Sequence, residues 1–304
     1  MTLSFSLPCA CLLLGIVNVA TVGSAVAGTT EPSAGVAGFT LPRSAVFELE
    51  DPLSQRRYQI AVQLPKSTAK LATAPQVYLL DAPYAFPIVT GAMRFPVNSG
   101  AMEDALVIGI GYALGDKGQT SRVRDYTPTR SNDWKLATGG AAAHADFIEQ
   151  VLFDEIARRF VPAGQGAGAT QTPRRIFIGN SLGGLFGGWL IQARPELFDD
   201  YILGSPSVWF DNEAVLKSTV APIADSKPLR PGRVFIAVGS AELPPAQRHD
   251  MVAGARKLKA RFSALPARQL EIKYLEIPEA DHSIAFPTSA IHGLSWLLGR
   301  PQND

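Results

Sequence analysis

The residues with the clearest potential for chemistry form the segment Gly179-Asn180-Ser181-Leu182-Gly183. A short apolar run ends at this segment, and an apolar helical pattern starts directly after it. A Gly-x-Ser-x-Gly turn between a strand and a helix is a nucleophile elbow, which holds a serine hydroxyl clear of the sheet. We expect both glycines to remove Cβ atoms that would clash in so sharp a turn. Ser181 is therefore the predicted nucleophile; the alternative is a Gly/Ser-rich turn without chemistry.

A serine nucleophile needs a general base within hydrogen-bond reach. In chains built around this elbow, the partners follow in the order serine, acid, histidine. His282 is the predicted base, because it comes after the last apolar β-rich run and before the last helical pattern. The other histidines fit this role less well: His249 and His292 fall in helical patterns, and His144 precedes the elbow.

The acid should follow the apolar run 234–239, where Glu242 is the first carboxylate. Its role would be to accept a hydrogen bond from His282 Nδ1, which fixes the tautomer and stabilises the imidazolium. Asp250 is the weaker alternative, and Asp281 is expected to stay on the surface of its loop. A solvated glutamate beside a Ser–His pair oriented by backbone or water also remains open.

An oxyanion hole needs two backbone N–H donors. The first predicted donor is Leu182, directly after the nucleophile, and the second should come from the loop after the third strand. That loop reads Asp81-Ala82-Pro83-Tyr84-Ala85. Pro83 has no N–H, so Ala82 or Tyr84 must donate if the hole is built there.

The elements that must position these residues alternate along the chain. Apolar β-rich runs predict strands at 45–50, 58–64, 76–80, 106–110, 175–179, 201–204, 234–239 and 270–277, and helical periodicity predicts helices at 140–160, 182–193, 248–265 and 289–298. The first two strands should form a hairpin, and the later ones should be buried on both faces. The pattern predicts an α/β fold with a doubly wound, mostly parallel, eight-stranded sheet, helices on both faces and no large cap domain. The stretches 112–138 and 207–232 are expected to be irregular, and the first is a candidate wall of the substrate pocket.

The composition and the N-terminus indicate where such a domain would work. The chain has 304 residues, 46% of them apolar, and a formal net charge of +1, so no global field attracts nucleic acid or an anionic membrane. The apolar stretch 11–17 and the small-x-small pattern Ala25-Val26-Ala27 predict a signal peptide over 1–27, cleaved after Ala27. We expect a flexible lead-in over 28–43, a single domain over 44–300 and a periplasmic or secreted location. No membrane span is expected in the mature form, and the oligomeric state stays open.

Cysteine and histidine usage argues against metal chemistry. Both cysteines, Cys9 and Cys11, fall within the predicted signal peptide, and no CxxC, HExxH or His/Cys cluster is present. We therefore expect neither a metal nor a cofactor.

These residues resemble the esterase family of α/β-hydrolases that includes esterase D, feruloyl esterases, mycolyltransferases and enterobactin-type siderophore esterases. The resemblance is strongest to the siderophore esterase branch and runs along roughly 45–290. It rests on the elbow with its following Gly-Leu-Phe, on Ser205-Pro-Ser-Val-Trp209, and on the segments 77–81, 107–111, 122–128, 139–140, 239–242 and 281–283. The resemblance implies Ser181 as nucleophile and His282 as base, with Glu242 as the candidate acid.

Two departures from the family pattern concern the site. The family usually has Gly after the aspartate of the third-strand motif and His before the nucleophile, where this chain has Ala82 and Asn180. Asn180 should leave the elbow intact, whereas Ala82 followed by Pro83 changes the oxyanion loop.

The long loop after the fourth strand supplies candidate substrate contacts. Arg122, Arg124 and Arg130 could receive an anionic or catecholate substrate through charge-assisted hydrogen bonds. Pairing with Asp125 and Asp133 is the favoured alternative. Tyr84, beside the oxyanion loop, is also a candidate contact, and Trp209 could line an aromatic subsite or simply pack.

Together these patterns predict a serine carboxylic-ester hydrolase that acts through an acyl-enzyme on a small-molecule ester, of siderophore type if the resemblance holds. Two alternatives stay open. One is an acyltransferase on the same machinery, and the other is a catalytically silent binding protein of the same fold.

Overall fold

The computed structural model describes residues 39–68, 71–161, 173–221, 232–265 and 270–301. The predicted signal peptide, residues 1–27, and most of the predicted lead-in, residues 28–43, lie outside these ranges. The chain divides into two units, Met1–Thr40 and Leu41–Asp304. Every helix and strand described below belongs to the second unit.

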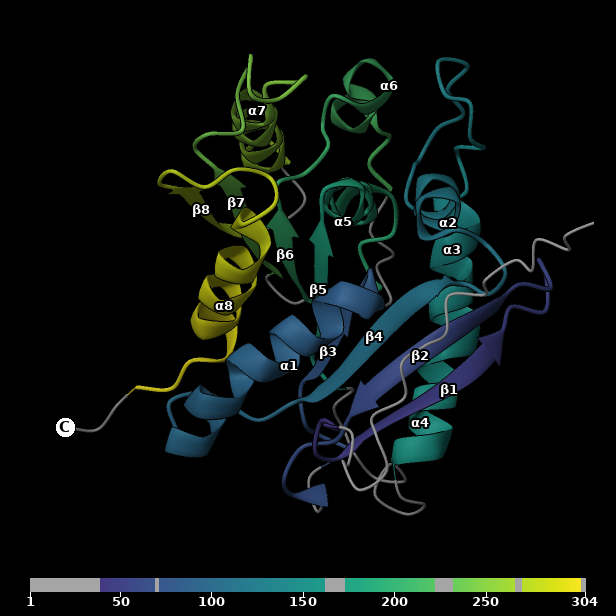
Figure 1. The fold of residues 1–304 in the computed structure, drawn as a ribbon, viewed down its shortest axis with the longest axis vertical. Helices are drawn as coiled ribbons and strands as arrows, with labels where there is room; N and C mark the ends of the chain where they lie inside the picture. The colour runs from purple at the N-terminus through teal and green to yellow at the C-terminus, as the bar shows by residue number, and fades with distance from the viewer. Residues whose placement is uncertain (1–38, 69–70, 162–172, 222–231, 266–269, 302–304) are drawn as a thin grey trace, which may run out of the picture. The chain divides into compact units, whose positions relative to one another are not determined.

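The second unit contains one sheet of eight strands in the order β1-β2-β4-β3-β5-β6-β7-β8 (Figure 1). β1 and β2 form the predicted antiparallel hairpin, β2 also pairs antiparallel with β4, and all other neighbours are parallel. The strands are Ser44–Glu50, Arg57–Gln63, Gln76–Leu79, Leu106–Ala113, Arg175–Asn180, Asp200–Gly204, Gly232–Gly239 and Leu270–Ile277. The predicted α/β-hydrolase fold with a mostly parallel eight-stranded sheet is confirmed.

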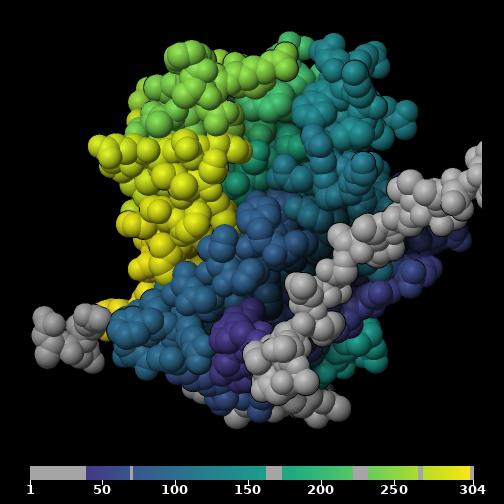
Figure 2. Space-filling view, viewed as in Figure 1, coloured from purple at the N-terminus to yellow at the C-terminus, as the bar shows by residue number. Residues whose placement is uncertain are grey.

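Alternate side chains of the central strands pack into two cores, one on each face of the sheet. In β3 and the residue after it, Val77 and Leu79 belong to one core, and Tyr78 and Leu80 belong to the other. The first core lies under α1 (Ala82–Ser99) and α8 (Ala285–Leu298), which run side by side on that face (Figures 1 and 2). The second core is covered by α3 (Ala141–Phe147), α4 (Phe153–Phe160), α5 (Leu182–Ala193) and α7 (Met251–Ser263). No helix among the described residues combines the length and apolar character that crossing a membrane requires.

The 18-residue helix α1 was not predicted from the sequence. Its three prolines hide it: one lies in the first turn, where proline is tolerated, and Pro87 and Pro96 lie in the interior, where proline normally breaks a helix. The signal that could have revealed it is the spacing of its buried residues, which recur every three or four positions: Ala82, Ala85, Phe86, Val89, Thr90 and Met93. The residues expected to form an oxyanion loop are therefore the end of a loop and the first turn of a helix.

The stretches expected to be irregular also contain short helices. α2 (Gly118–Asp125) lies within 112–138, and α6 (Phe210–Glu213) and the 3₁₀ turn η3 (Ala214–Lys217) lie within 207–232. Conversely, the predicted helix 140–160 is interrupted by a π-helical segment, η2 (Ile148–Leu152), between α3 and α4. Short polar helices such as α2 carry too little apolar periodicity to be recognised in a sequence.

The elbow between β5 and α5 depends on one of its two motif glycines. Ser181 has φ 57° and ψ −115°, a backbone conformation that residues with a side chain rarely adopt. A Cβ on Gly179 would lie 2.3 Å from the carbonyl oxygen of Gly183, so this position requires glycine. The same expectation was wrong for Gly183, where a Cβ would lie 3.5 Å from Leu80 Cδ1, an ordinary contact distance.

We predict opposite effects for alanine at these two positions. Gly179→Ala should destabilise the protein by about 3 kcal/mol or more, because the added methyl overlaps backbone that cannot move without opening the elbow. Gly183→Ala fills ordinary contact space in the first turn of α5, and helix propensity favours alanine there by up to about 1 kcal/mol. Urea unfolding measures both values. Equal losses for the two variants would contradict the assignment of the clash to Gly179.

Candidate active site

The centre of the candidate site is a contact between two residues from different loops. Glu242 follows β7, and His282 lies between β8 and α8. The structure places Glu242 Oε2 2.5 Å from His282 Nδ1. The carboxylate is fully buried and the imidazole is partly exposed. This is the geometry in which a carboxylate fixes the tautomer of a histidine and leaves Nε2 free.

The other carboxylate oxygen of Glu242 is held by the protein interior. Oε1 accepts hydrogen bonds from the Ser205 hydroxyl at 2.5 Å and from the Gly239 N–H at 2.7 Å. Ser205 is fully buried and has a positive φ of 39°. A buried carboxylate is costly unless it is hydrogen-bonded, so these donors both stabilise its charge and fix its plane. Ser205 has no predicted role in the sequence, although it opens the Ser-Pro-Ser segment that resembles the family.

The predicted nucleophile lies at the carboxyl end of β5, where its backbone is bonded to the loop after β6. The Ser181 N–H donates to the Gly204 carbonyl at 2.9 Å, and the Ser207 N–H donates to the Ser181 carbonyl at 3.1 Å. The Ser181 hydroxyl lies 3.2 Å from the Ser207 hydroxyl. Among the hydrogen bonds of the described residues there is none between Ser181 and His282.

The remaining histidines and alternative acids have local roles. Asp250 caps α7 by accepting from the Ala253 N–H at 2.7 Å, and Asp281 accepts from the N–H groups of two following loop residues. His292 is exposed on α8. His144 is buried in an aromatic cluster, where burial lowers its pKa.

Two backbone N–H groups near Ser181 are free to donate. Leu182 and Ala82 are the first residues of α5 and α1, and the first N–H groups of a helix have no acceptor within it. Neither N–H takes part in a hydrogen bond among those of the described residues. The Tyr84 N–H, the alternative to Ala82, instead donates to the Asp81 carbonyl at 3.2 Å. The sequence left Ala82 and Tyr84 as alternatives for the second oxyanion donor. Of these two backbone N–H groups, that of Ala82 is the one available to a substrate.

The turn that presents the Ala82 amide is fixed by an ion pair. Asp81 is buried with φ 56°, and its two carboxylate oxygens accept from Arg122 Nε and Nη2, each at 3.1 Å. Burial alone would lower the pKa of Arg122, but the charge and hydrogen bonds of Asp81 outweigh it and raise that pKa above its usual value. Arg122 Nη2 also lies 3.5 Å from the Asn180 carbonyl. Arg122 therefore joins the turn at Asp81 to the elbow.

The expected pairing of the loop arginines was partly wrong. Arg124 pairs with Asp125 at 2.7 Å, as expected, and also with Asp116 at 2.6 Å, whereas Arg122 pairs with Asp81. Arg130 is exposed and forms no ion pair with any other described residue. Of the arginines proposed to receive substrate, only Arg130 is left without a carboxylate partner.

Tyr84 and Trp209 lie in different surroundings. The Tyr84 hydroxyl donates to Asp81 Oδ2 at 3.3 Å, and burial and the negative charge of Asp81 raise its pKa. Trp209 stacks directly on His249, with ring centroids 4.0 Å apart and planes inclined by 5°. It also lies parallel to Trp134, with centroids 6.1 Å apart. These three rings line a pocket of about 600 Å³.

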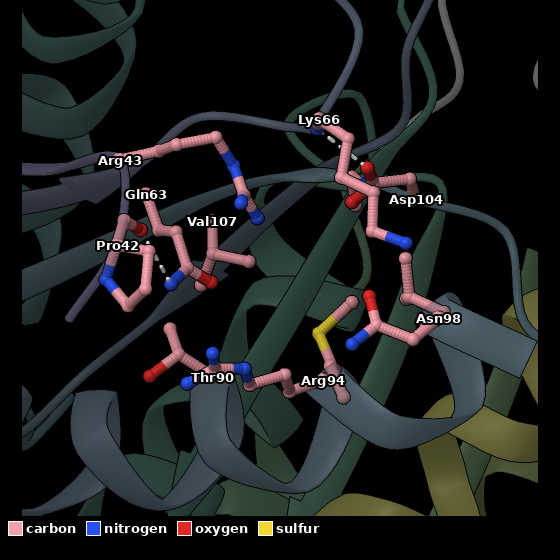
Figure 3. Close-up of a pocket in the computed structure, with 12 residues that line it drawn as sticks. Pro42, Arg43, Gln63, Lys66, Thr90, Arg94, Asn98, Asp104 and Val107 are labelled. Atoms are coloured by element: carbon pink, nitrogen blue, oxygen red, sulfur yellow. Dashed lines mark hydrogen bonds between the residues drawn. The ribbon is translucent and has the colours of Figure 1, made fainter.

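A second, smaller pocket lies beside α1 at the amino-terminal end of β4, away from the carboxyl ends of the parallel strands (Figure 3). It has a volume of about 110 Å³, and the side chains of Arg43, Lys66 and Arg94 surround it. None of the residues predicted to act in catalysis or substrate binding lines it.

Within the ranges that the structure describes, no group of three or more His, Cys, Asp or Glu residues could hold a metal ion.

Comparison with known proteins finds related esterases and solved structures of similar fold. Ferri-bacillibactin esterase BesA of Bacillus subtilis (strain 168) is 29% identical over 275 residues, which cover 86% of this chain and 91% of that protein. The siderophore triacetylfusarinine C esterase of Aspergillus fumigatus is 30% identical over 62% of this chain and 63% of that protein. The crystal structure of the BES protein from Bacillus cereus superposes with a TM-score of 0.71 at 24% identity, covering 89% of this chain and 100% of that one. At that identity, the superposition shows the fold alone.

The family comparison covers the whole candidate site. The family described as "Putative esterase" matches residues 53–286, a segment that includes Ser181, Glu242 and His282. The match spans more than half of the chain, in agreement with the resemblance found in the sequence motifs. The chain belongs to this esterase family.

Proposed function

We propose that the protein is a serine esterase that hydrolyses siderophore-type esters through an acyl-enzyme. The observation that carries the proposal is the buried Glu242 carboxylate bonded to His282 Nδ1 in a member of an esterase family. Ser181 stands at the elbow of the same site, with two unpartnered amides beside it. Nucleophile, base, acid and oxyanion donors are the four roles that acyl transfer requires.

The first half-reaction begins when Ser181 Oγ turns from Ser207 towards His282 Nε2. Oγ attacks the ester carbonyl carbon while Nε2 takes its proton, and Glu242 stabilises the imidazolium that results. The negative charge that develops on the carbonyl oxygen is accepted by the N–H groups of Leu182 and Ala82. One such donor is typically worth about 3 kcal/mol in the transition state. The imidazolium then protonates the leaving alcohol, and the acyl group stays on Ser181.

The second half-reaction uses the same groups with water in place of the serine. His282 Nε2 removes a proton from water, the hydroxide attacks the acyl carbonyl, and the proton returns to Ser181 Oγ. The acid leaves and the serine is restored. No external cofactor is needed for either half.

The substrate class is supported by the relatives. The names of the Bacillus subtilis and Aspergillus fumigatus proteins identify them as esterases of ferri-bacillibactin and of triacetylfusarinine C, respectively. One has a bacterial and the other a fungal source, and both names describe ester cleavage in a siderophore. This supports a siderophore ester over a feruloyl sugar as substrate.

We predict that the wild-type protein hydrolyses trilactone siderophores faster than short p-nitrophenyl esters or feruloyl sugars, measured as kcat/KM. Ser181→Ala and His282→Ala should each lower kcat by about 10³-fold or more, because each removes a group that acts in the chemical step. Glu242→Gln should also lower kcat strongly, because its amide oxygen would take the two donors at the Oε1 position and its N–H₂ group would face His282 Nδ1, which favours the wrong tautomer. A protein whose rates on every ester equal those of Ser181→Ala would contradict the proposal.

We also predict that Ser205 positions the acid. Ser205→Ala removes one of the two donors to Glu242 Oε1, which frees the carboxylate to rotate away from His282. A hydrogen bond to a charged group is worth about 1.5–3 kcal/mol, so kcat should fall about tenfold or more while KM stays near the wild-type value. Steady-state kinetics on a soluble ester separates the two constants.

Ser289→Ala is the matched control. Ser289 is also fully buried, but its hydroxyl donates to the Ala285 carbonyl within α8. Its loss should affect stability to a similar extent and leave kcat unchanged. If both serine variants lower kcat equally, Ser205 has no specific role in positioning Glu242.

A further inference from the structure

The pocket beside α1 that is surrounded by Arg43, Lys66 and Arg94, called the basic pocket below, has no role in the proposed reaction (Figure 3). Its three cations come from three separate parts of the chain: the loop before β1, the loop after β2, and α1. Val107, near the start of β4, also lines it, whereas Ser181 follows the carboxyl end of β5, which runs parallel to β4 in the same sheet. A ligand in the basic pocket would therefore bind apart from the ester.

The floor of the basic pocket is apolar. Met93, Ala105 and Val107 are buried there. The Thr90 hydroxyl on the same floor is used within α1, where it donates to the Phe86 carbonyl at 2.7 Å. The volume of about 110 Å³ gives room for several water molecules, or for one ion of about five heavy atoms. The groups that would hold such an ion are thus the polar side chains of the rim.

Positive charge predominates on this rim. The lining contains three cations and one carboxylate, that of Asp104. The two oxygens of Asp104 already accept backbone N–H groups, from Lys66 at 2.7 Å and from Ala105 at 3.0 Å. Among the described residues, no ion pair includes Asp104 or any of the three cations. An excess of two positive charges is therefore left without compensation by the described part of the chain.

Arg43 is held in position by its own backbone contacts. Its φ of 58° is a conformation that costs free energy for a residue with a side chain. The Leu64 N–H donates to the Arg43 carbonyl, and Arg43 Nε donates to the Leu64 carbonyl, each at 3.0 Å. With Nε bonded, the plane of the guanidinium is fixed and both Nη groups are left to donate to a ligand. Figure 3 shows the Arg43 and Arg94 side chains reaching the pocket from opposite sides.

The number and direction of these donors favour a tetrahedral dianion. A carboxylate has two oxygens in one plane, and a single guanidinium fork satisfies both of them. Donors that converge from three parts of the chain instead match a group whose oxygens point in several directions, such as phosphate. The excess of two positive charges also matches the charge of about −1.5 to −2 that a phosphomonoester carries at neutral pH.

We propose that the basic pocket binds a phosphate dianion, either inorganic phosphate or the end of a phosphomonoester. A bound phosphate would connect α1, through Arg94, to the loop before β1 and the loop after β2. Two interior prolines of α1, Pro87 and Pro96, each remove a helical hydrogen bond. Because the ligand binds the folded protein, it should stabilise this helix and the fold. The site is independent of the esterase reaction, so failure of one leaves the other standing.

Calorimetric titration of the full-length protein with inorganic phosphate, at an ionic strength held constant with sodium chloride, tests the site. We expect one saturable site with a Kd of about 1 mM or lower. Arg43→Gln and Arg94→Gln should each weaken binding about tenfold, because each removes charge-assisted hydrogen bonds to the ligand. Absence of saturable binding to the wild type, or unchanged affinity in both variants, would overturn the proposal.

Arg57→Gln is the matched control for charge. Arg57 lies on β2, is exposed and pairs with Glu48, so its loss lowers the net charge equally without touching the basic pocket. The phosphate affinity of this variant should equal that of the wild type. A loss as large as that of Arg43→Gln would show that binding follows overall charge, and would overturn the basic pocket as a site.

Thermal unfolding separates site binding from the general effect of the salt. Phosphate also stabilises folded proteins because it is excluded from their surface, an effect that needs no site and does not saturate. Binding at the site should saturate and raise the Tm by about 3 °C at ten times the Kd. Arg94→Gln should lose this saturable part. A rise of equal size and shape in the wild type and in Arg94→Gln would contradict the proposal.

Two further ligands identify the chemistry that the pocket selects. Methyl phosphate keeps the dianion and adds one carbon: affinity at least equal to that of phosphate assigns the pocket to a phosphomonoester, and weaker affinity assigns it to inorganic phosphate. Acetate offers a planar monoanion and should bind about tenfold more weakly than phosphate. Equal affinities for acetate and phosphate would overturn the assignment of a tetrahedral dianion.

Discussion

The backbone of Ser181 is the constraint on which the site depends. A residue with a side chain at φ 57° and ψ −115° costs on the order of 1–3 kcal/mol, and it persists only where its surroundings over-determine it. Gly179 permits the close approach of β5 to α5, and hydrogen bonds to the loop after β6 hold the serine on both sides. That loop also carries Ser205 and Trp209. The position of the nucleophile and the support of the acid are consequently set by one connection.

Two buried carboxylates, those of Glu242 and Asp81, fix different parts of the candidate site. Glu242 receives three hydrogen bonds and orients His282, so its negative charge lies beside the imidazole of the predicted base. Asp81 receives both donors of the Arg122 fork and fixes the turn that offers the Ala82 amide. Breaking either set would leave a buried charge without compensation, which costs several kcal/mol. The polar network therefore stabilises the same geometry that the proposed reaction uses.

The sequence predicted the sheet and the candidate triad residues because their signals are local. Continuous apolar runs mark buried strands, and Gly-x-Ser-x-Gly marks the elbow. It did not predict α1, whose prolines contradict its apolar spacing, or the Asp81–Arg122 pair, whose members are 41 positions apart. Ser205, Ser207 and the stack of Trp209 on His249 were missed for the same reason, since pairing across loops depends on strand order. The signal peptide over 1–27 stays a prediction, because that segment lies outside the described residues.

In the proposed reaction the acyl group is carried by Ser181, although the Ser207 hydroxyl lies only 3.2 Å from the Ser181 hydroxyl. Rapid acid quenching of the protein with a short acyl ester, followed by mass spectrometry, would identify the modified residue. Fragmentation is needed, because the only tryptic cleavage candidate between the two serines, Arg194, precedes a proline. We expect one acyl group, on Ser181, that appears within the first turnover and is then released by water. An acyl group on Ser207, or turnover without any acyl-enzyme, would contradict it.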